Sequence, residues 1–194
     1  MSQALDIGLS CRPRKEGNSL VFDYELHNRS RTAVYAADAM RVVDGEPPLA
    51  RADAQAVSII LREDMDAVVG KFLPPVPPHW RMVVPAVPLA VAVEPGATVA
   101  RSLSVRLPLA ETSPLVDDLS IRDYDMLDIQ AVVLAIGYWA ADTPGLDVAA
   151  ARFSPEHMQL AMADPRNGAR MVWQRYPVRG LMLFRRNDAF PRTV

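Results

Sequence analysis

A strictly alternating segment, Leu20 to Asn28, constrains this chain more than any other part of its sequence. Apolar residues occupy every second position, at Leu20, Phe22, Tyr24 and Leu26, and the charged or polar residues Asp23, Glu25 and His27 fall on the other face. Successive side chains of a β-strand point to opposite faces, so the pattern predicts a strand with one face in a core. We expect residues 33–43 to be its hairpin partner, closing at Asp44-Gly45.

Three further segments carry strand patterns. Leu103, Val105 and Leu107 alternate with polar residues, and residues 129–139 are apolar on both faces, which is typical of a strand covered on both sides. Residues 169–176 and 178–184 predict a final strand, or two strands broken at Pro177. Because proline cannot donate a ladder hydrogen bond, we expect this break at an edge or a bulge.

The segment 52–72 allows two interpretations. Its content of Ala, Arg, Asp, Gln and Glu fits a helix, whereas residues 57–61 and 67–72 fit a hairpin that turns at Glu63 to Asp66. We favour the hairpin because the neighbouring segments are strands.

Prolines are dense between residues 74 and 95, where we expect a crossover between sheets or an edge rather than a helix or a central strand. Two short helical turns are predicted at Ser113-Pro114 and Ser154-Pro155, because each pair places a capping side chain before a proline. The second would begin a short helical insertion near 153–164.

These segments together predict an all-β chain, with residues 1–194 forming a single two-sheet sandwich that has one or two short helical turns. The strand that ends in Leu26-His27-Asn28-Arg29-Ser30, the following Val34-Tyr35, and the turn Glu94-Pro95-Gly96 before residues 103–109 resemble immunoglobulin-like sandwich domains of bacterial proteins. The resemblance is loosely to the intracellular proteinase-inhibitor type. It implies a fold and no site residues.

Composition indicates the compartment and excludes several partners. Cys11 is the single cysteine, so an intrachain disulfide is excluded, and no leader-like or membrane-length apolar run is present. We therefore expect a cytoplasmic protein, and the bias of its basic residues toward arginine is typical of a GC-rich bacterial genome. The net charge of −2 gives no general attraction to nucleic acid or to a membrane.

No motif of a nucleophile elbow, a phosphate-binding loop or a dinucleotide fold occurs, and we expect no cofactor. The histidines His27, His79 and His157 have no metal-ligand spacing, and we expect them at the surface or at strand ends. An acidic loop over residues 117–128 is the candidate for Ca²⁺ or a small ligand, with the carboxylates of Asp117, Asp118, Asp123, Asp125 and Asp128. Its spacing differs from that of an EF-hand.

The sharper functional signal is a proline-rich segment ending in an aromatic residue. Such segments are pre-ordered ligands for proteins, and the partner-binding candidates here are Pro74, Pro75, Pro77, Pro78 and Trp80. The alternative is a crossover whose prolines protect a sheet edge. The sequence thus favours a non-enzymatic interaction module that binds another protein or associates with itself through an edge strand. A Ca²⁺ or small-ligand sandwich is the alternative, and a hydrolase is the third hypothesis.

Overall fold

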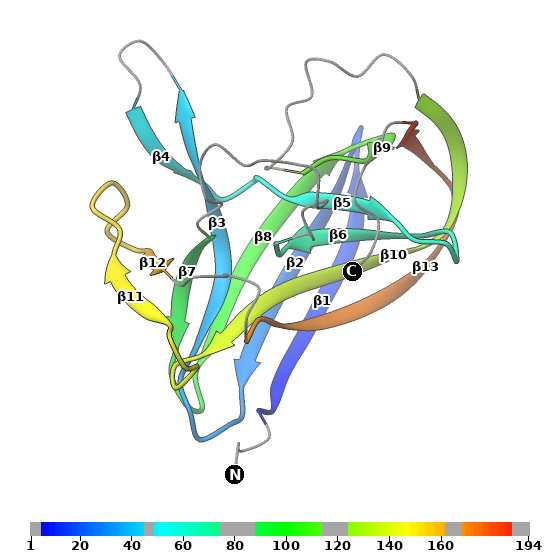
Figure 1. The fold of residues 1–194 in the computed structure, drawn as a ribbon. Helices are drawn as coiled ribbons and strands as arrows, with labels where there is room; N and C mark the ends of the chain where they lie inside the picture. Colours follow the sequence, from blue (N-terminus) through cyan, green and yellow to red (C-terminus); the bar gives the residue numbers. More distant parts are fainter. Residues whose placement is uncertain (1–4, 45–48, 74–87, 114–123, 162–167, 188–194) are drawn as a thin grey trace.

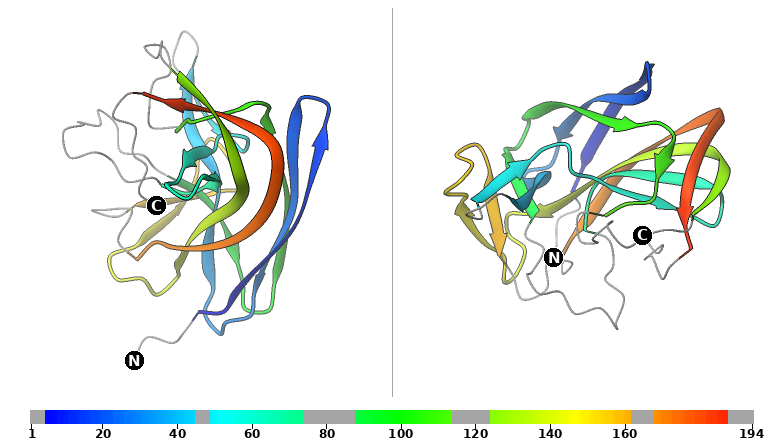
Figure 2. Two further views of the ribbon diagram at one scale, coloured as in Figure 1. Left: turned by 90° about the vertical axis from the view of Figure 1, so that its right-hand side faces the viewer. Right: turned by 90° about the horizontal axis from the view of Figure 1, so that it is seen from above.

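The computed structural model describes residues 5–44, 49–73, 88–113, 124–161 and 168–187, and these residues form strands, turns and loops without a helix. The strands assemble into a three-stranded sheet and a ten-stranded sheet (Figure 1). In both views of Figure 2 the small sheet stands to one side of the long curved strands of the large sheet. The predicted all-β, sandwich-like architecture is therefore confirmed. Within the described residues, no helix is long and apolar enough to cross a membrane.

The small sheet has the order β1 (Ile7–Glu16), β2 (Ser19–Asn28) and β8 (Thr98–Arg106), and both pairings are antiparallel. The alternation of residues 20–26 is confirmed, since the apolar members of β2 are buried while Asp23 and Glu25 are exposed. Leu103 and Val105 of β8 point to the same core.

The predicted hairpin of residues 20–28 with residues 33–43 is wrong. β3 (Val34–Asp44) belongs to the large sheet, where it pairs with β7 (Pro88–Val93), β4 (Leu49–Asp53) and the end of β10 (Tyr124–Ala140). The chain crosses between the sheets after Asn28. The buried side-chain Nδ2 of Asn28 donates to the backbone carbonyls of Thr32 and Val93. A strand's periodicity shows which face is buried but not which strand lies beside it, and this crossing was therefore missed.

The large sheet runs β11 (Asp147–Ala150), β12 (Met158–Ala161), β7, β3, β10, β13 (Arg170–Arg186) and β9 (Leu109–Ala110). β10 is covered on both faces as predicted, because Val132 and Leu134 face the small sheet while Val133 and Ala135 pack in a separate cluster.

The favoured hairpin in segment 52–72 is confirmed. β5 (Ser58–Leu61) pairs antiparallel with β6 (Asp66–Lys71), and β6 lies parallel to β10. Gly70 allows this parallel approach, since a Cβ on Gly70 would collide with the backbone carbonyl of Ala135. The final strand is also confirmed, and Pro177 lies at an irregularity in its register with β10.

Two predictions for proline-containing segments require correction. Residues 88–93 of the expected crossover form β7, which is paired on both sides, with β3 and β12; Pro88 is tolerated as its first residue. The helical insertion near 153–164 is not found, because Ser154 to His157 form turns that lead directly into strand β12. Residues 74–87, Pro114 and residues 162–164 lie outside the described part of the chain.

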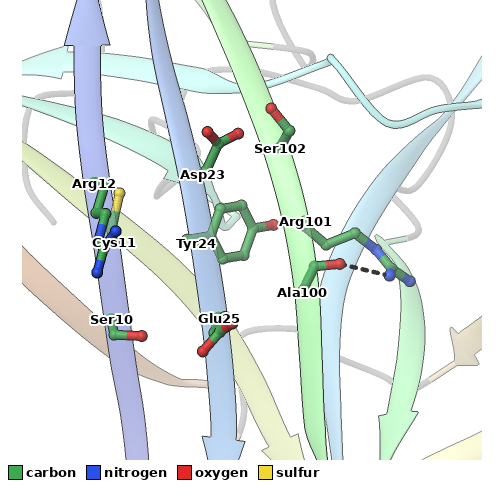
Figure 3. Close-up of a pocket in the computed structure, with 9 residues that line it drawn as sticks. All are labelled: Ser10, Cys11, Arg12, Asp23, Tyr24, Glu25, Ala100, Arg101 and Ser102. Carbon is green, nitrogen blue, oxygen red and sulfur yellow. Dashed lines mark hydrogen bonds between the residues drawn. The ribbon is translucent and has the colours of Figure 1, made fainter.

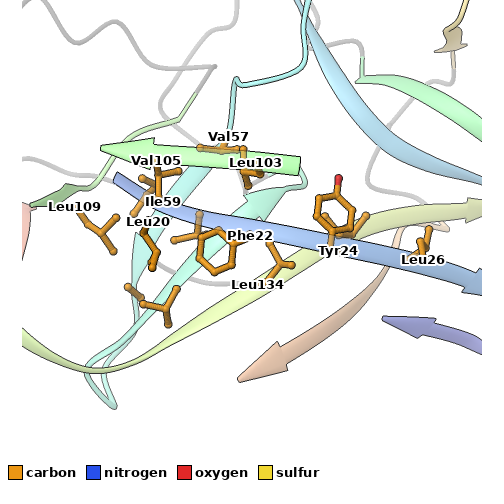
Figure 4. Packing of buried hydrophobic residues seen from close by; sticks show 14 of the residues in the cluster. Leu20, Phe22, Tyr24, Leu26, Val57, Ile59, Leu103, Val105, Leu109 and Leu134 are labelled. Carbon is orange, nitrogen blue, oxygen red and sulfur yellow. The ribbon is translucent and has the colours of Figure 1, made fainter. Parts of the chain in front are cut away.

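The main core fills the space between the two sheets. Figure 4 shows Phe22 and Leu103 of the small sheet packed near Ile59 and Leu134 of the large sheet. A second buried set, which includes Trp139 and Leu160, lies on the opposite face of the large sheet under the β11–β12 hairpin. The inner face of the small sheet is therefore buried against the large sheet, and its outer face and its edges lie outside this core.

Candidate binding edge of the small sheet

The outer edge of β8 presents unpaired backbone groups. The amide of Asn28 donates to the carbonyl of Ala97 and the amide of Leu107 to that of Asn18, so the odd-numbered residues of this stretch direct their backbone groups toward β2. In an antiparallel ladder the intervening residues direct theirs away from the partner. Thr98, Ala100 and Ser102 are therefore oriented outward, and all three are exposed.

Side chains of this protein already form hydrogen bonds with some of the outward backbone groups of β8. The Ser104 amide donates to the side-chain oxygen of Gln55 at 3.0 Å, and Arg101 Nη1 donates to the Ala100 carbonyl at 3.0 Å. Within the described ranges, the N–H and C=O groups of Thr98 and Ser102 and the N–H of Ala100 have no such partner. The free stretch of the β8 edge, Thr98 to Ser102, is thus bounded at one end by Gln55.

The opposite edge of the small sheet, on β1, is interrupted in its middle. The amide of Arg29 donates to the carbonyl of Asp6, so by the same alternation the odd-numbered residues of β1 direct their backbone groups outward. Among these, Pro13 has no N–H and the Cys11 carbonyl accepts from the Tyr176 hydroxyl at 3.2 Å. Lys15 adds a charge. Proline and lysine are the residues with which sheet edges avoid unwanted pairing.

A hollow of about 700 Å³ lies over the middle of the small sheet (Figure 3). Its exposed lining residues are Ser10, Arg12, Asp23, Glu25, Ala100 and Ser102, and its remaining lining residues are Cys11, Tyr24 and Arg101. Since neighbours in a strand alternate, this second set directs its side chains toward the core and contributes backbone to the floor.

The hollow exists because short side chains flank Glu25 on both neighbouring strands. Glu25 on the central strand lies opposite Ser10 on β1 and Ala100 on β8, and neither reaches far above the sheet. Asp23 is ion-paired with Arg14, whereas Glu25 has only the imidazole of His27 nearby, at 3.4 Å. Glu25 is therefore the less compensated of the two carboxylates.

A group of charged and polar side chains on the inner side of the small sheet connects β8 to the large sheet. Asp38 projects from the irregular register of β3, and its carboxylate accepts two hydrogen bonds from Arg101 Nε, at 2.9 and 3.0 Å. Lys71 Nζ lies 3.4 Å from the same carboxylate and 6.0 Å from the ring centroid of Tyr24. His157 Nε2 lies 3.1 Å from the second oxygen of Asp38. We call these four residues (Asp38, Lys71, Arg101 and His157) the charge clamp.

The charge clamp shifts the ionisation of its members. Burial alone would raise the pKa of Asp38, but the Arg101 hydrogen bonds and the charge of Lys71 outweigh it and lower that pKa. Burial lowers the pKa of Lys71, and Asp38 opposes this shift. The pKa of Tyr24 is raised, first by burial and then by the negative charge of Asp38. The clamp thus holds an ionised carboxylate that joins β3 and β6 to β8 and to the β11–β12 hairpin.

Ser154, His157 and Asp38 form a continuous hydrogen-bonded chain, because Ser154 Oγ lies 2.7 Å from His157 Nδ1. The order is that of a catalytic triad, but the geometry supports a structural role. Ser154 is buried, whereas a nucleophile must be accessible to its substrate. Asp38 is also shared with two cations. The chain therefore anchors the turn before β12.

The residues predicted from sequence do not assemble into this site. Asp117, Asp118 and Asp123 lie outside the described residues, as do Pro74, Pro75, Pro77, Pro78 and Trp80. Asp125 and Asp128 lie on β10 and, three positions apart in a regular stretch, point to opposite faces. Among the residues that the structure describes, no group of His, Cys, Asp and Glu is arranged to hold a metal ion.

The charge clamp was missed in the sequence. Of the two places expected for the histidines, His157 lies at a strand end, directly before β12, but it is buried and not at the surface. One signal was present: Asp38 interrupts the apolar stretch Ala36-Ala37-Asp38-Ala39, and a charge inside a buried strand requires a partner. Comparison with family models, curated proteins and solved structures finds no match to this chain.

Proposed function

We propose that this protein is a non-enzymatic interaction module that binds an extended segment of another protein along the free edge of β8. The observation that carries the proposal is the contrast between the two edges of the small sheet. The β1 edge also has outward backbone groups without a partner among the described residues, at Ile7, Leu9 and Lys15, but it is interrupted by Pro13 and by the capped carbonyl of Cys11, and it packs against β13. On β8, Thr98, Ala100 and Ser102 are exposed, and five of their backbone groups have no partner in the described chain.

Addition of a strand to an open sheet edge is a recurrent mode of peptide recognition, in which backbone hydrogen bonds provide the affinity. The charge clamp supports this use of β8. Arg101 holds the strand to Asp38 of the large sheet, so the edge is ordered before a partner arrives, and less conformational entropy is lost on binding.

The immunoglobulin-like assignment and a cytoplasmic location stay predictions. The two-sheet architecture and the strand alternation support the first, and the single cysteine supports the second. Self-association through the same edge is the alternative occupancy, because two copies of β8 can pair around an outward-facing residue.

Proline substitution on the edge tests the proposal. Ala100→Pro removes an N–H that points away from the sheet and leaves the ladder with β2 intact. Lys15→Pro is the matched control, since it removes an equivalent outward N–H from the opposite edge. We expect Ala100→Pro to abolish binding of a partner captured from the native lysate and Lys15→Pro to retain it, with both variants folded by circular dichroism. Equal binding by the two variants would refute the use of β8.

A further inference from the structure

Resting on the proposed function, we infer that the segment bound along β8 carries a lysine or arginine on its outward face, and that Glu25 recognises this residue across the hollow. The partner is thus an extended peptide with a basic residue opposite Ala100. Three observations lead to this assignment: the register of the sheet, the size of the side chains beside the edge, and the distribution of charge on the outer face.

The register places Glu25 in line with the free edge. Ala100 lies directly opposite Glu25 in the β2–β8 ladder, and the side chains of both point to the outer face. A strand added to β8 would place one residue opposite Ala100, with its side chain on the same face. Its Cα would lie about 10 Å from that of Glu25, which is two strand spacings. Extended lysine or arginine and glutamate side chains span this separation together.

The short side chains of β8 leave that path open. Ala100 has only a methyl group and Ser102 only a hydroxymethyl group, and both line the hollow with Glu25. A long basic side chain can therefore lie flat over Ala100, with its aliphatic part against the methyl group and its charged end at the carboxylate. A bulky residue at position 100 would close this route.

The charges on the outer face of the small sheet favour a positively charged side chain in the bound segment. Glu25 has no arginine or lysine within ion-pair distance in the described chain, and its side chain is 55% exposed. Asp23 is already ion-paired with Arg14, which also contacts Glu16. Arg12 lies on the far side of β2 from the edge, opposite Asp23. An incoming acidic side chain over Ala100 would meet Glu25 at close range, and like charges across a sheet are unfavourable.

Selection of displayed random linear peptides on the immobilised full chain tests this inference. We expect the enriched peptides to alternate apolar and polar residues and to share a lysine or arginine at one polar position. Glu25→Gln should weaken their binding by up to about fivefold at low ionic strength, with a smaller loss in high salt. Glu16→Gln is the matched control, because it removes an exposed carboxylate of the same sheet away from the hollow. Glu25→Lys should change the preference to peptides with aspartate or glutamate.

The outcomes separate this inference from the proposed function. If Ala100→Pro or Ser102→Pro abolishes binding but the peptides have no shared basic residue, or if Glu25→Gln and Glu16→Gln behave alike, the basic partner is refuted and strand addition stands. If the peptides bind equally to wild type and to both edge variants, or if none is enriched, strand addition itself is refuted. Two edge prolines are used so that a folding defect in one of them leaves the test intact.

Discussion

Replacement of Asp38 by asparagine removes the single anion of the charge clamp and keeps the shape of the side chain. Lys71, whose side chain is only 3% exposed, would then lie in the core without a counter-charge, and the equally buried His157 would lose its carboxylate partner. Arg101 would also lose both of its carboxylate bonds, although it is partly exposed and can turn toward water. The side-chain NH₂ group of the asparagine would also place a hydrogen-bond donor next to the donors of Lys71 and Arg101.

The buried charge of Lys71 determines how much stability Asp38→Asn should lose. Removing one partner of a buried ion pair costs about 3–5 kcal/mol, because the other charge remains desolvated. With a urea m-value in the upper part of the usual range, about 3 kcal/mol/M, this corresponds to a decrease of at least about 1 M in the midpoint. Equilibrium urea unfolding followed by tryptophan fluorescence measures it.

A double-mutant cycle isolates the cause. Lys71→Met removes the buried cation while Asp38 keeps its two bonds from Arg101, so it should cost less than Asp38→Asn. The double variant Asp38→Asn/Lys71→Met should then be more stable than Asp38→Asn alone. An Asp38→Asn variant within about 1 kcal/mol of the wild type, or strictly additive effects, would refute the clamp as described.

Three further predictions concern stability. The pKa of Asp38 is lowered in the folded state, so the stability that its carboxylate contributes should be complete above its unfolded pKa of about 3.9 and should be lost as the pH falls through the folded pKa. Urea titrations should therefore show that the stability difference between wild type and Asp38→Asn shrinks in acid and stays constant between about pH 5 and 7. Gly70→Ala should destabilise the protein by about 3 kcal/mol through collision with the β10 backbone, while Gly137→Ala, whose Cβ has only ordinary contacts, should cost much less in thermal melts. Asn28→Ala should cost about 1–3 kcal/mol by urea unfolding, because a buried carbonyl of β7 loses its donor.

Periodicity predicted the local structure of this chain well and its pairing poorly. The alternation of β2 and the apolar character of β10 depend on which face is buried, and that information is carried by neighbouring residues. The choice of β8 and β1 as partners of β2, in place of β3, depends on contacts between residues that are far apart in the chain. The local hydrogen bonds at the crossing come from Asn28 and Ser30, and neither residue indicates in the sequence which strand lies beside β2.

The sequence predicted the type of binding surface, a strand edge, but not its position in the fold. Interaction through an edge strand was one of the two ways in which the sequence hypothesis allowed the protein to associate, but the edge that it considered lay within residues 74–95, of which 88–93 form the doubly paired β7. An edge is free when no other strand reaches it, and this is a property of the whole topology. Ala100 and Ser102 have no feature in the sequence that separates them from the polar side of any other amphipathic strand.

Hydrogen exchange at the β8 edge tests the central claim most directly. In the free protein, the outward amides of Thr98, Ala100 and Ser102 should exchange quickly, whereas the inward amides of Arg101 and Leu103 should be protected by the ladder with β2. Binding of a selected peptide should slow exchange at the three outward amides and leave the outward amide of Lys15 on β1 unchanged. Unaltered exchange at Thr98, Ala100 and Ser102 in the saturated complex would contradict strand addition at β8.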